Sequence, residues 1–388
     1  MPTEFRRRSV VPAIAAVAAL TVASAVAAAA VTATVARLVV VPARRFRYDV
    51  RIRSVSTDLT SIILDATADS VIDGRYSFWF SNETGHLRLG EILERTNATV
   101  TRRIENITFG DVRRARLGRI SSWYYLRPED LDHPVESVEI RTDGGTAPAW
   151  LFPTAGGSER WAIHVHGRGT RRQECLRSID TFNSAGFTNL IVSYRNDSDA
   201  PSSPDGRYGL GSTEWRDVDA AIDFAVERGA RQIVLFGWSM GGAIVLQTIT
   251  RSAHADVVSG LVLDSPVVDW LETLQYQAAA MRLPAPLTRA ALETLAAPWG
   301  GRVTGLAAPI DLAVMDFVTR AEALTVPVLL MHSDDDGYVP PDAARALAAA
   351  RPDIVTYVPF QTARHTKLWN YDEERWRQAV DDWLRKLA

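Results

Sequence analysis

The stretch Gly-Trp-Ser-Met-Gly at residues 237–241 constrains the fold more than any other part of the chain. It follows an apolar run of strand length at residues 231–236 and precedes residues 242–249, whose composition suits a buried helix. A serine between two glycines at a sharp turn from strand to helix is the pattern of a nucleophile elbow. The small glycines let the strand and helix close around a strained seryl backbone. The pattern therefore makes Ser239 the candidate nucleophile.

A serine hydroxyl is a weak nucleophile and needs an oriented base. Two candidate partners lie downstream, each after an apolar run of strand length. Residues 326–332 run into three aspartates at positions 334–336, and residues 354–359 precede a loop that contains His365. Open α/β sheets build their sites at the carboxyl ends of strands, so both partners are expected near the elbow. The order serine, acid, histidine fits a Ser-His-Asp triad on such a scaffold.

These motifs resemble the α/β-hydrolase superfamily, in the group of serine aminopeptidase-like and prolyl oligopeptidase-like hydrolases. Members often carry Asp-x-x-Val-Pro after the acid strand, and residues 336–340 read Asp-Gly-Tyr-Val-Pro. The resemblance implies that Asp336 is the catalytic acid and His365 the base, with Asp334 and Asp335 as solvated turn residues. It also implies an α/β-hydrolase fold, in which helices flank a mostly parallel central sheet.

The strand at residues 161–167 ends in His-Gly and is followed by Arg168. In this superfamily, the turn after that strand and the residue after the nucleophile each supply one backbone N–H to an oxyanion hole. Carried over to this chain, the two donors are Arg168 and Met240. Each fixed N–H dipole is worth about 3 kcal/mol of barrier. His164 and His166 have no third ligand at a spacing suited to zinc, and we expect neither a metal nor an organic cofactor.

Strands alternate with helices over residues 135–388, which predicts the mostly parallel sheet of a catalytic domain. An insertion at about residues 267–323, rich in Ala, Leu, Trp and Pro, lies where α/β-hydrolases commonly carry a helical cap. Its apolar residues either line a pocket or form the cap's own core. Residues 48–132 contain alternating runs such as 50–55 and 76–80 between glycines. They predict a small β-rich accessory domain, either a packing spacer or a substrate-presenting module.

A basic tail at residues 1–9 precedes an apolar stretch without charge from Val10 to Ala36. That stretch exceeds the ~20 residues needed to cross a bilayer. We expect a transmembrane helix at residues 10–41 that acts as an uncleaved signal anchor. The alternative is a cleaved signal peptide, whose apolar core usually spans only about 7–15 residues. Arginines flank both ends, so the positive-inside rule gives no orientation. The common signal-anchor arrangement predicts a single-pass membrane protein with an extracytoplasmic catalytic domain.

The formal net charge of −3 speaks against nucleic-acid binding. Of the 43 basic side chains, all but Lys367 and Lys386 are arginines, a bias typical of GC-rich bacterial genomes. The sequence therefore predicts a membrane-anchored serine hydrolase that cleaves a small-molecule or lipid-like acyl ester through an acyl-enzyme. One alternative is a serine peptidase of the aminopeptidase or oligopeptidase kind, which would need an acidic residue to hold the substrate amine. The other is a non-enzymatic binding protein on a hydrolase scaffold.

Overall fold

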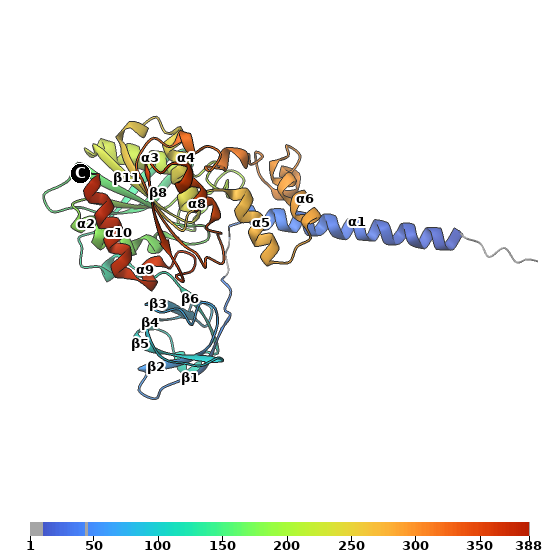
Figure 1. The fold of residues 1–388 in the computed structure, drawn as a ribbon, viewed down its shortest axis with the longest axis horizontal. Coiled ribbons are helices and arrows are strands. Elements are labelled where there is room, and N and C mark those ends of the chain that lie inside the picture. Colours follow the sequence, from blue (N-terminus) through green and yellow to red (C-terminus); the bar gives the residue numbers. More distant parts are fainter. Residues whose placement is uncertain (1–10, 43–45, 388) are drawn as a thin grey trace, which may run out of the picture.

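The computed structural model describes residues 11–42 and 46–387. An N-terminal helix, a small β-barrel and a domain built around a large sheet follow one another along the chain (Figure 1). The basic tail expected at residues 1–9 lies outside the described residues, as does the first residue of the expected membrane helix.

Helix α1 (Val11–Val40) has 30 residues, which corresponds to a length of about 45 Å. Its segment Ala23–Val40 has a mean hydropathy of 1.8. Among the described residues, α1 is the one helix long and apolar enough to cross a membrane, a test that a signal sequence also passes. It projects away from the rest of the protein, and its last turns lie against α6 (Ala285–Ala296) and α7 (Gly301–Thr304) (Figure 1).

The expected β-rich region is confirmed, and it forms a closed antiparallel barrel. In barrel order the strands are β1 (Val50–Val55), β2 (Ser61–Asp65), β5 (Thr99–Phe109), β4 (Gly85–Arg95), β3 (Tyr76–Phe80) and β6 (Leu117–Ser121). Two 3₁₀ turns follow β5 and β6, η1 (Val112–Arg114) and η2 (Pro128–Asp130). Alternating residues of the strands fill an apolar interior. The buried guanidinium of Arg102 donates to the backbone carbonyls of Ile72 and Gly90, which ties the loop before β3 to the barrel wall.

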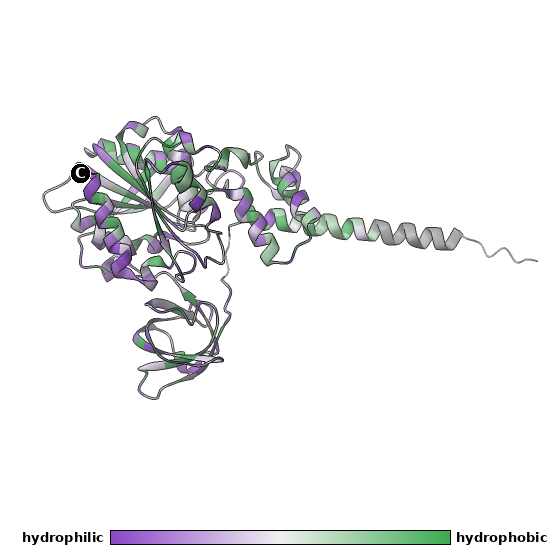
Figure 2. Ribbon diagram, viewed as in Figure 1, coloured by the Kyte–Doolittle hydropathy of each residue, from purple (hydrophilic) through white to green (hydrophobic). Residues whose placement is uncertain are grey.

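The third part is the α/β-hydrolase fold that the sequence predicts, with an eight-stranded sheet. In sheet order the strands are β14 (Val355–Phe360), β13 (Val328–Ser333), β12 (Val258–Asp264), β11 (Gln232–Trp238), β9 (Arg160–Val165), β10 (Thr188–Val192), β8 (Gly145–Phe152) and β7 (Glu136–Thr142). The six strands from β14 to β10 run parallel, and the β7–β8 hairpin adds an antiparallel edge. Green, hydrophobic strands mark this sheet as the core (Figure 2).

Helices cover both faces of the sheet (Figure 1). One face packs against α3 (Trp215–Glu227), α4 (Met240–Arg251) and α8 (Asp342–Ala350). The other packs against η3 (Arg172–Ser178), α2 (Ile179–Ser184), α9 (Leu368–Tyr371) and α10 (Glu373–Lys386). The short turn η4 (Ala255–Val257) leads into β12.

The expected helical cap is also confirmed between β12 and β13. It consists of α5 (Trp270–Ala280), α6, α7 and the turns η5 (Ala313–Met315) and η6 (Ala321–Ala323). Two hydrogen bonds fix α5 over the carboxyl ends of the strands. The indole of Trp270 donates to the carbonyl of Leu210 at 2.8 Å, and the hydroxyl of Tyr276 donates to the carbonyl of Asp336 at 3.3 Å.

The barrel joins the hydrolase domain through α9. The side-chain amide of Asn370 donates to the backbone carbonyls of Arg75 and Ser122. The backbone carbonyl of Asn370 accepts the backbone N–H of Arg75. Gly74, with φ of 108°, lies so close to this helix that a β-carbon there would come within 2.0 Å of the Asn370 carbonyl oxygen. The barrel is therefore bonded to the segment that directly follows His365.

Candidate active site

Ser239 lies at the turn between β11 and α4, with φ of 52° and ψ of −117°. A non-glycine residue rarely adopts a positive φ, and here it aims the side chain out of the strand-to-helix turn. The flanking glycines make the turn possible. A β-carbon on Gly237 would come within 2.4 Å of the Gly241 carbonyl oxygen, and one on Gly241 within 2.1 Å of the Val165 carbonyl oxygen. The backbone has the geometry of a nucleophile elbow.

The structure brings the three residues of the expected triad together. His365 Nε2 lies 2.9 Å from Ser239 Oγ, and His365 Nδ1 lies 2.7 Å from Asp336 Oδ2. The carboxylate on Nδ1 leaves the proton on that nitrogen and directs the lone pair of Nε2 at the hydroxyl. A histidine in this tautomer can accept the seryl proton.

Asp336 is buried and is held by more than His365. Its Oδ1 accepts the backbone N–H groups of Tyr338 at 2.8 Å and Val339 at 2.9 Å. His332 Nε2 lies 3.3 Å from its Oδ2. Burial alone would raise the pKa of Asp336, but the charges and hydrogen bonds of His365 and His332 hold that pKa well below its ordinary value. The carboxylate therefore stays ionised. No sequence motif points to His332, although this histidine stands only four residues before Asp336.

The two neighbouring aspartates are engaged elsewhere. Asp334 lies 2.6 Å from a guanidinium nitrogen of Arg345. Asp335 Oδ1 accepts the hydroxyl of Ser333 at 2.7 Å and the backbone N–H of Arg364 at 2.9 Å. Of the three adjacent acids, Asp336 is the one placed on the histidine.

The turn after β9 lies directly against the nucleophile, since a β-carbon on Gly167 would come within 3.0 Å of the Ser239 β-carbon. The N–H groups of Arg168 and Met240 have no acceptor within residues 11–42 and 46–387. Two unpaired donors beside the nucleophile match the geometry of an oxyanion hole.

Glu174 shapes this turn, and the sequence analysis did not single it out. Its buried Oε2 accepts the N–H of Gly167 at 2.9 Å and the hydroxyl of Thr170 at 2.7 Å. The carboxylate therefore pairs the N–H of Gly167, whereas the next N–H in the turn, that of Arg168, is not bonded to it. No sequence signal separates Glu174 from a surface acid, because its partners become neighbours only in the folded turn.

His166 lies beneath the same turn. Its Nε2 lies 2.8 Å from Asp197 Oδ2, its Nδ1 2.9 Å from the Gly167 carbonyl oxygen, and its ring stacks on Tyr194. Burial alone would lower the pKa of His166, but Asp197 raises that pKa above the ordinary value. His164 has separate partners, Asn189 and Ser178.

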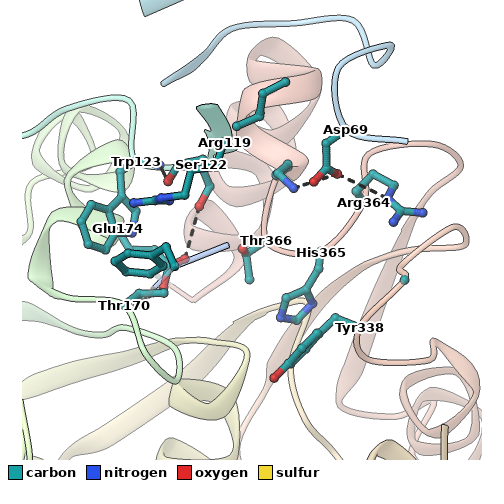
Figure 3. Close-up of a pocket in the computed structure, with 15 residues that line it drawn as sticks. Asp69, Arg119, Ser122, Trp123, Thr170, Glu174, Tyr338, Arg364, His365 and Thr366 are labelled. Carbon is teal, nitrogen blue, oxygen red and sulfur yellow. Dashed lines mark hydrogen bonds and ion pairs between the residues drawn. The ribbon is translucent and has the colours of Figure 1, made fainter. Parts of the chain in front are cut away.

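His365 opens onto a cleft of about 310 Å³ between the barrel and the hydrolase domain (Figure 3). Asp69, Arg119 and Trp123 line it from the barrel side, together with Glu174 and His365 (Figure 3). Most of the lining residues carry polar side chains, but the two acids are already paired. Glu174 is bonded to the turn, and Asp69 lies 3.0 Å from Lys367 and 3.6 Å from Arg364.

Comparison with known families agrees with this geometry. The model of the family described as "Alpha/beta hydrolase family" matches residues 162–381, more than half of the chain. The protein belongs to the α/β hydrolase family, and the match supports a hydrolase. A second model, described as "Domain of unknown function (DUF8805)", matches residues 51–121 and coincides with the barrel. No curated protein matches the sequence.

Solved structures share the fold at low sequence identity. The Pyrococcus furiosus esterase Pf2001 is 17% identical, with a TM-score of 0.52, over 68% of this chain and 94% of that one. Est1E from Butyrivibrio proteoclasticus, solved with ferulic acid bound, is 18% identical, with a TM-score of 0.50, over 64% of this chain and 98% of that one. At these identities the likeness establishes the fold.

Proposed function

We propose that this protein is a membrane-anchored serine hydrolase that cleaves a carboxylic ester through a Ser239–His365–Asp336 triad. The observation that carries the proposal is the continuous path of hydrogen bonds from Ser239 Oγ through His365 to Asp336, at 2.9 and 2.7 Å. A seryl backbone with φ of 52° adds support, because such strain persists where the surrounding structure holds it for a purpose.

In the first half of the reaction, Ser239 Oγ attacks the ester carbonyl carbon while His365 Nε2 takes the hydroxyl proton. The carbonyl oxygen gains the negative charge and is held by the N–H groups of Arg168 and Met240. The intermediate collapses by breaking the bond between the acyl carbon and the alcohol oxygen. That oxygen takes the proton from His365 and leaves as the alcohol, and the acyl group stays on Ser239.

In the second half, a water molecule gives a proton to His365 Nε2 and attacks the acyl carbon. The bond to Ser239 Oγ breaks, Oγ recovers the proton, and the carboxylic acid leaves. Asp336 keeps the imidazole in the required tautomer and stabilises the imidazolium in both halves, without itself taking a proton. The low pKa of Asp336 supports this role.

The cleft favours an ester over the peptidase alternative. An aminopeptidase needs a carboxylate to pair with the substrate ammonium group. The acids that line the cleft, Asp69 and Glu174, are already bonded to Lys367 and to the Gly167 turn. The non-enzymatic alternative leaves the triad distances unexplained. The fold neighbour Pf2001 is named an esterase, which agrees with the proposal.

We assign α1 as the membrane anchor and place the catalytic domain outside the cytoplasm. The exposed apolar side chains of Val26 and Val31 support insertion of this helix. The acyl substrate is the expected partner, and no contact with nucleic acid is proposed.

Active-site labelling tests the proposal. The purified full-length protein should react with a fluorophosphonate probe and hydrolyse p-nitrophenyl esters faster than aminoacyl amides. Ser239→Ala should abolish the labelling and lower ester turnover by about 10⁶. Labelling that persists in Ser239→Ala, or faster turnover of the amides, would overturn the proposal.

A further inference from the structure

A second cavity, of about 970 Å³, lies on the cap side of the triad and is mostly apolar. Small-molecule sites commonly measure about 300–1,000 Å³. Three elements line it: the last turns of α1 with Leu38 and Val39, helix α5 with Leu274, and helix α6 with Leu292. Three separate elements thus enclose one apolar space, although the sequence left open whether the cap residues line a pocket.

The cavity adjoins the cleft onto which His365 opens. Tyr338 lines both this cavity and the polar cleft, and the centre of its ring is 5.1 Å from that of His365. Arg168, the proposed oxyanion donor, also lines the cavity. A chain that fills the cavity as far as Tyr338 therefore ends beside His365.

Helix α1 is a fixed wall of this cavity. The guanidinium of Arg168 donates to the carbonyls of Leu38 at 2.5 Å and Val41 at 3.2 Å, and the N–H of Tyr208 donates to the carbonyl of Val40 at 2.8 Å. These bonds satisfy carbonyls that every helix C-terminus leaves unpaired. Ala36 is fully buried against the hydrolase domain. The C-terminal end of α1 is therefore hydrogen-bonded to Arg168, in the turn after β9.

The part of α1 before Val35 is long enough to cross a bilayer and ends beside the cavity. The residues before Val35, about 24 of them, span ~36 Å at ~1.5 Å each, against ~30 Å of hydrocarbon. Exposed apolar side chains continue from this helix onto the cap, with Leu38 60% and Met281 57% exposed at the cavity lining. An exposed apolar patch continuous with a membrane helix is suited to contact lipid.

We propose that this cavity binds the acyl chain of a long-chain, lipid-like ester, and that α1 forms one wall of the binding site as well as the anchor. The assignment rests on the proposed ester hydrolysis. The polar cleft takes the alcohol portion, while the acyl chain enters the cavity from the bilayer surface between α1 and the cap.

Two adjacent alanines of α5 provide a matched test. Ala280 lines the cavity, whereas Ala279 lies on a different face of the helix and lines a neighbouring hollow of the cap. Both are exposed, so tryptophan at either position leaves the core intact. The measured quantity is kcat/KM for p-nitrophenyl dodecanoate divided by that for the butyrate, in full-length protein in lipid nanodiscs.

Ala280→Trp should lower this ratio by about tenfold or more, because the filled cavity excludes several methylenes. Ala279→Trp should stay within about twofold of the unchanged protein. Leu38→Trp, on the α1 wall, should also lower the ratio, because its side chain faces the same space.

The outcomes separate the two proposals. Butyrate hydrolysis that depends on Ser239, with an unchanged ratio in Ala280→Trp and Leu38→Trp, would overturn the acyl site and leave the ester hydrolase standing. A lower ratio in Ala280→Trp alone would remove α1 from the site. Absence of any ester turnover in the unchanged protein would overturn both proposals.

Discussion

Asp69, in the β-barrel, accepts a 3.0 Å hydrogen bond from the ammonium group of Lys367, two residues after His365. The same carboxylate lies 3.6 Å from Nε of Arg364, the residue before the histidine. Both immediate neighbours of His365 have a positive φ, 62° at Arg364 and 52° at Thr366. Non-glycine residues in this conformation cost about 1–3 kcal/mol each and need outside contacts to hold them. The barrel supplies such contacts, so it positions the histidine loop as well as forming one side of the cleft.

Neutralising Asp69 should therefore slow the reaction without unfolding the protein. We expect Asp69→Asn to lower kcat by about tenfold, since small displacements of a catalytic group cost activity steeply. KM and the melting temperature should change little, because the pair is partly exposed. Asp69→Glu should recover most of the rate. Asp73→Asn, an exposed acid of the same barrel, is the matched control, and an equal loss in that variant would contradict the positioning role.

The acid of the triad can be tested against its neighbours. Asp336→Asn keeps the shape of the side chain but presents an amide to His365 and favours the wrong tautomer, so kcat should fall by about 10⁴. Asp334→Asn should leave kcat nearly unchanged, because Asp334 faces Arg345 at the surface. Steady-state hydrolysis of p-nitrophenyl butyrate measures both. Loss of activity in Asp334→Asn together with an active Asp336→Asn would show that Asp336 is not the catalytic acid.

The parts of the site that local patterns encode were predictable from the sequence. Neighbouring residues alone identify the elbow glycines at 237 and 241 and the acid motif at 336–340. The alternation of strands and helices predicts the fold. Strands β4 and β6 of the barrel were not predicted. Clear apolar alternation was the signal used for strands, and charged residues interrupt it in β4.

Residues whose roles depend on distant partners were missed. Asp69 lies almost 300 positions from Lys367 in the sequence, and Glu174 resembles any acid at the start of a helix. The docking of α1 onto Arg168, 127–130 positions away, is a contact that periodicity cannot show.

Removing the Glu174 carboxylate should loosen the turn after β9, which contains Gly167 and Arg168. Glu174→Ala frees the N–H of Gly167 and the hydroxyl of Thr170, so the turn loses its fixed geometry. We expect kcat to fall by about 10²-fold, comparable to the loss of one oxyanion donor. Glu174→Gln retains an acceptor oxygen and should lose much less. Fluorophosphonate labelling rates report on the same turn, and equal rates in Glu174→Ala and the unchanged protein would exclude this role.

The buried His166–Asp197 pair should make stability depend on pH. The pKa of His166 is raised above its ordinary value of 6.5 in the folded protein, so the folded state holds this proton more tightly than the unfolded state does. The stabilisation from the pair is fully present below pH 6.5 and is lost as the pH rises through the raised pKa. Denaturant titrations of the full-length protein at pH 6 and at pH 9 measure the loss. In His166→Gln the free energy of unfolding should be lower at pH 6, and the difference from the unchanged protein should shrink at pH 9. A difference that stays constant between the two pH values would mean that folding does not shift the pKa of His166.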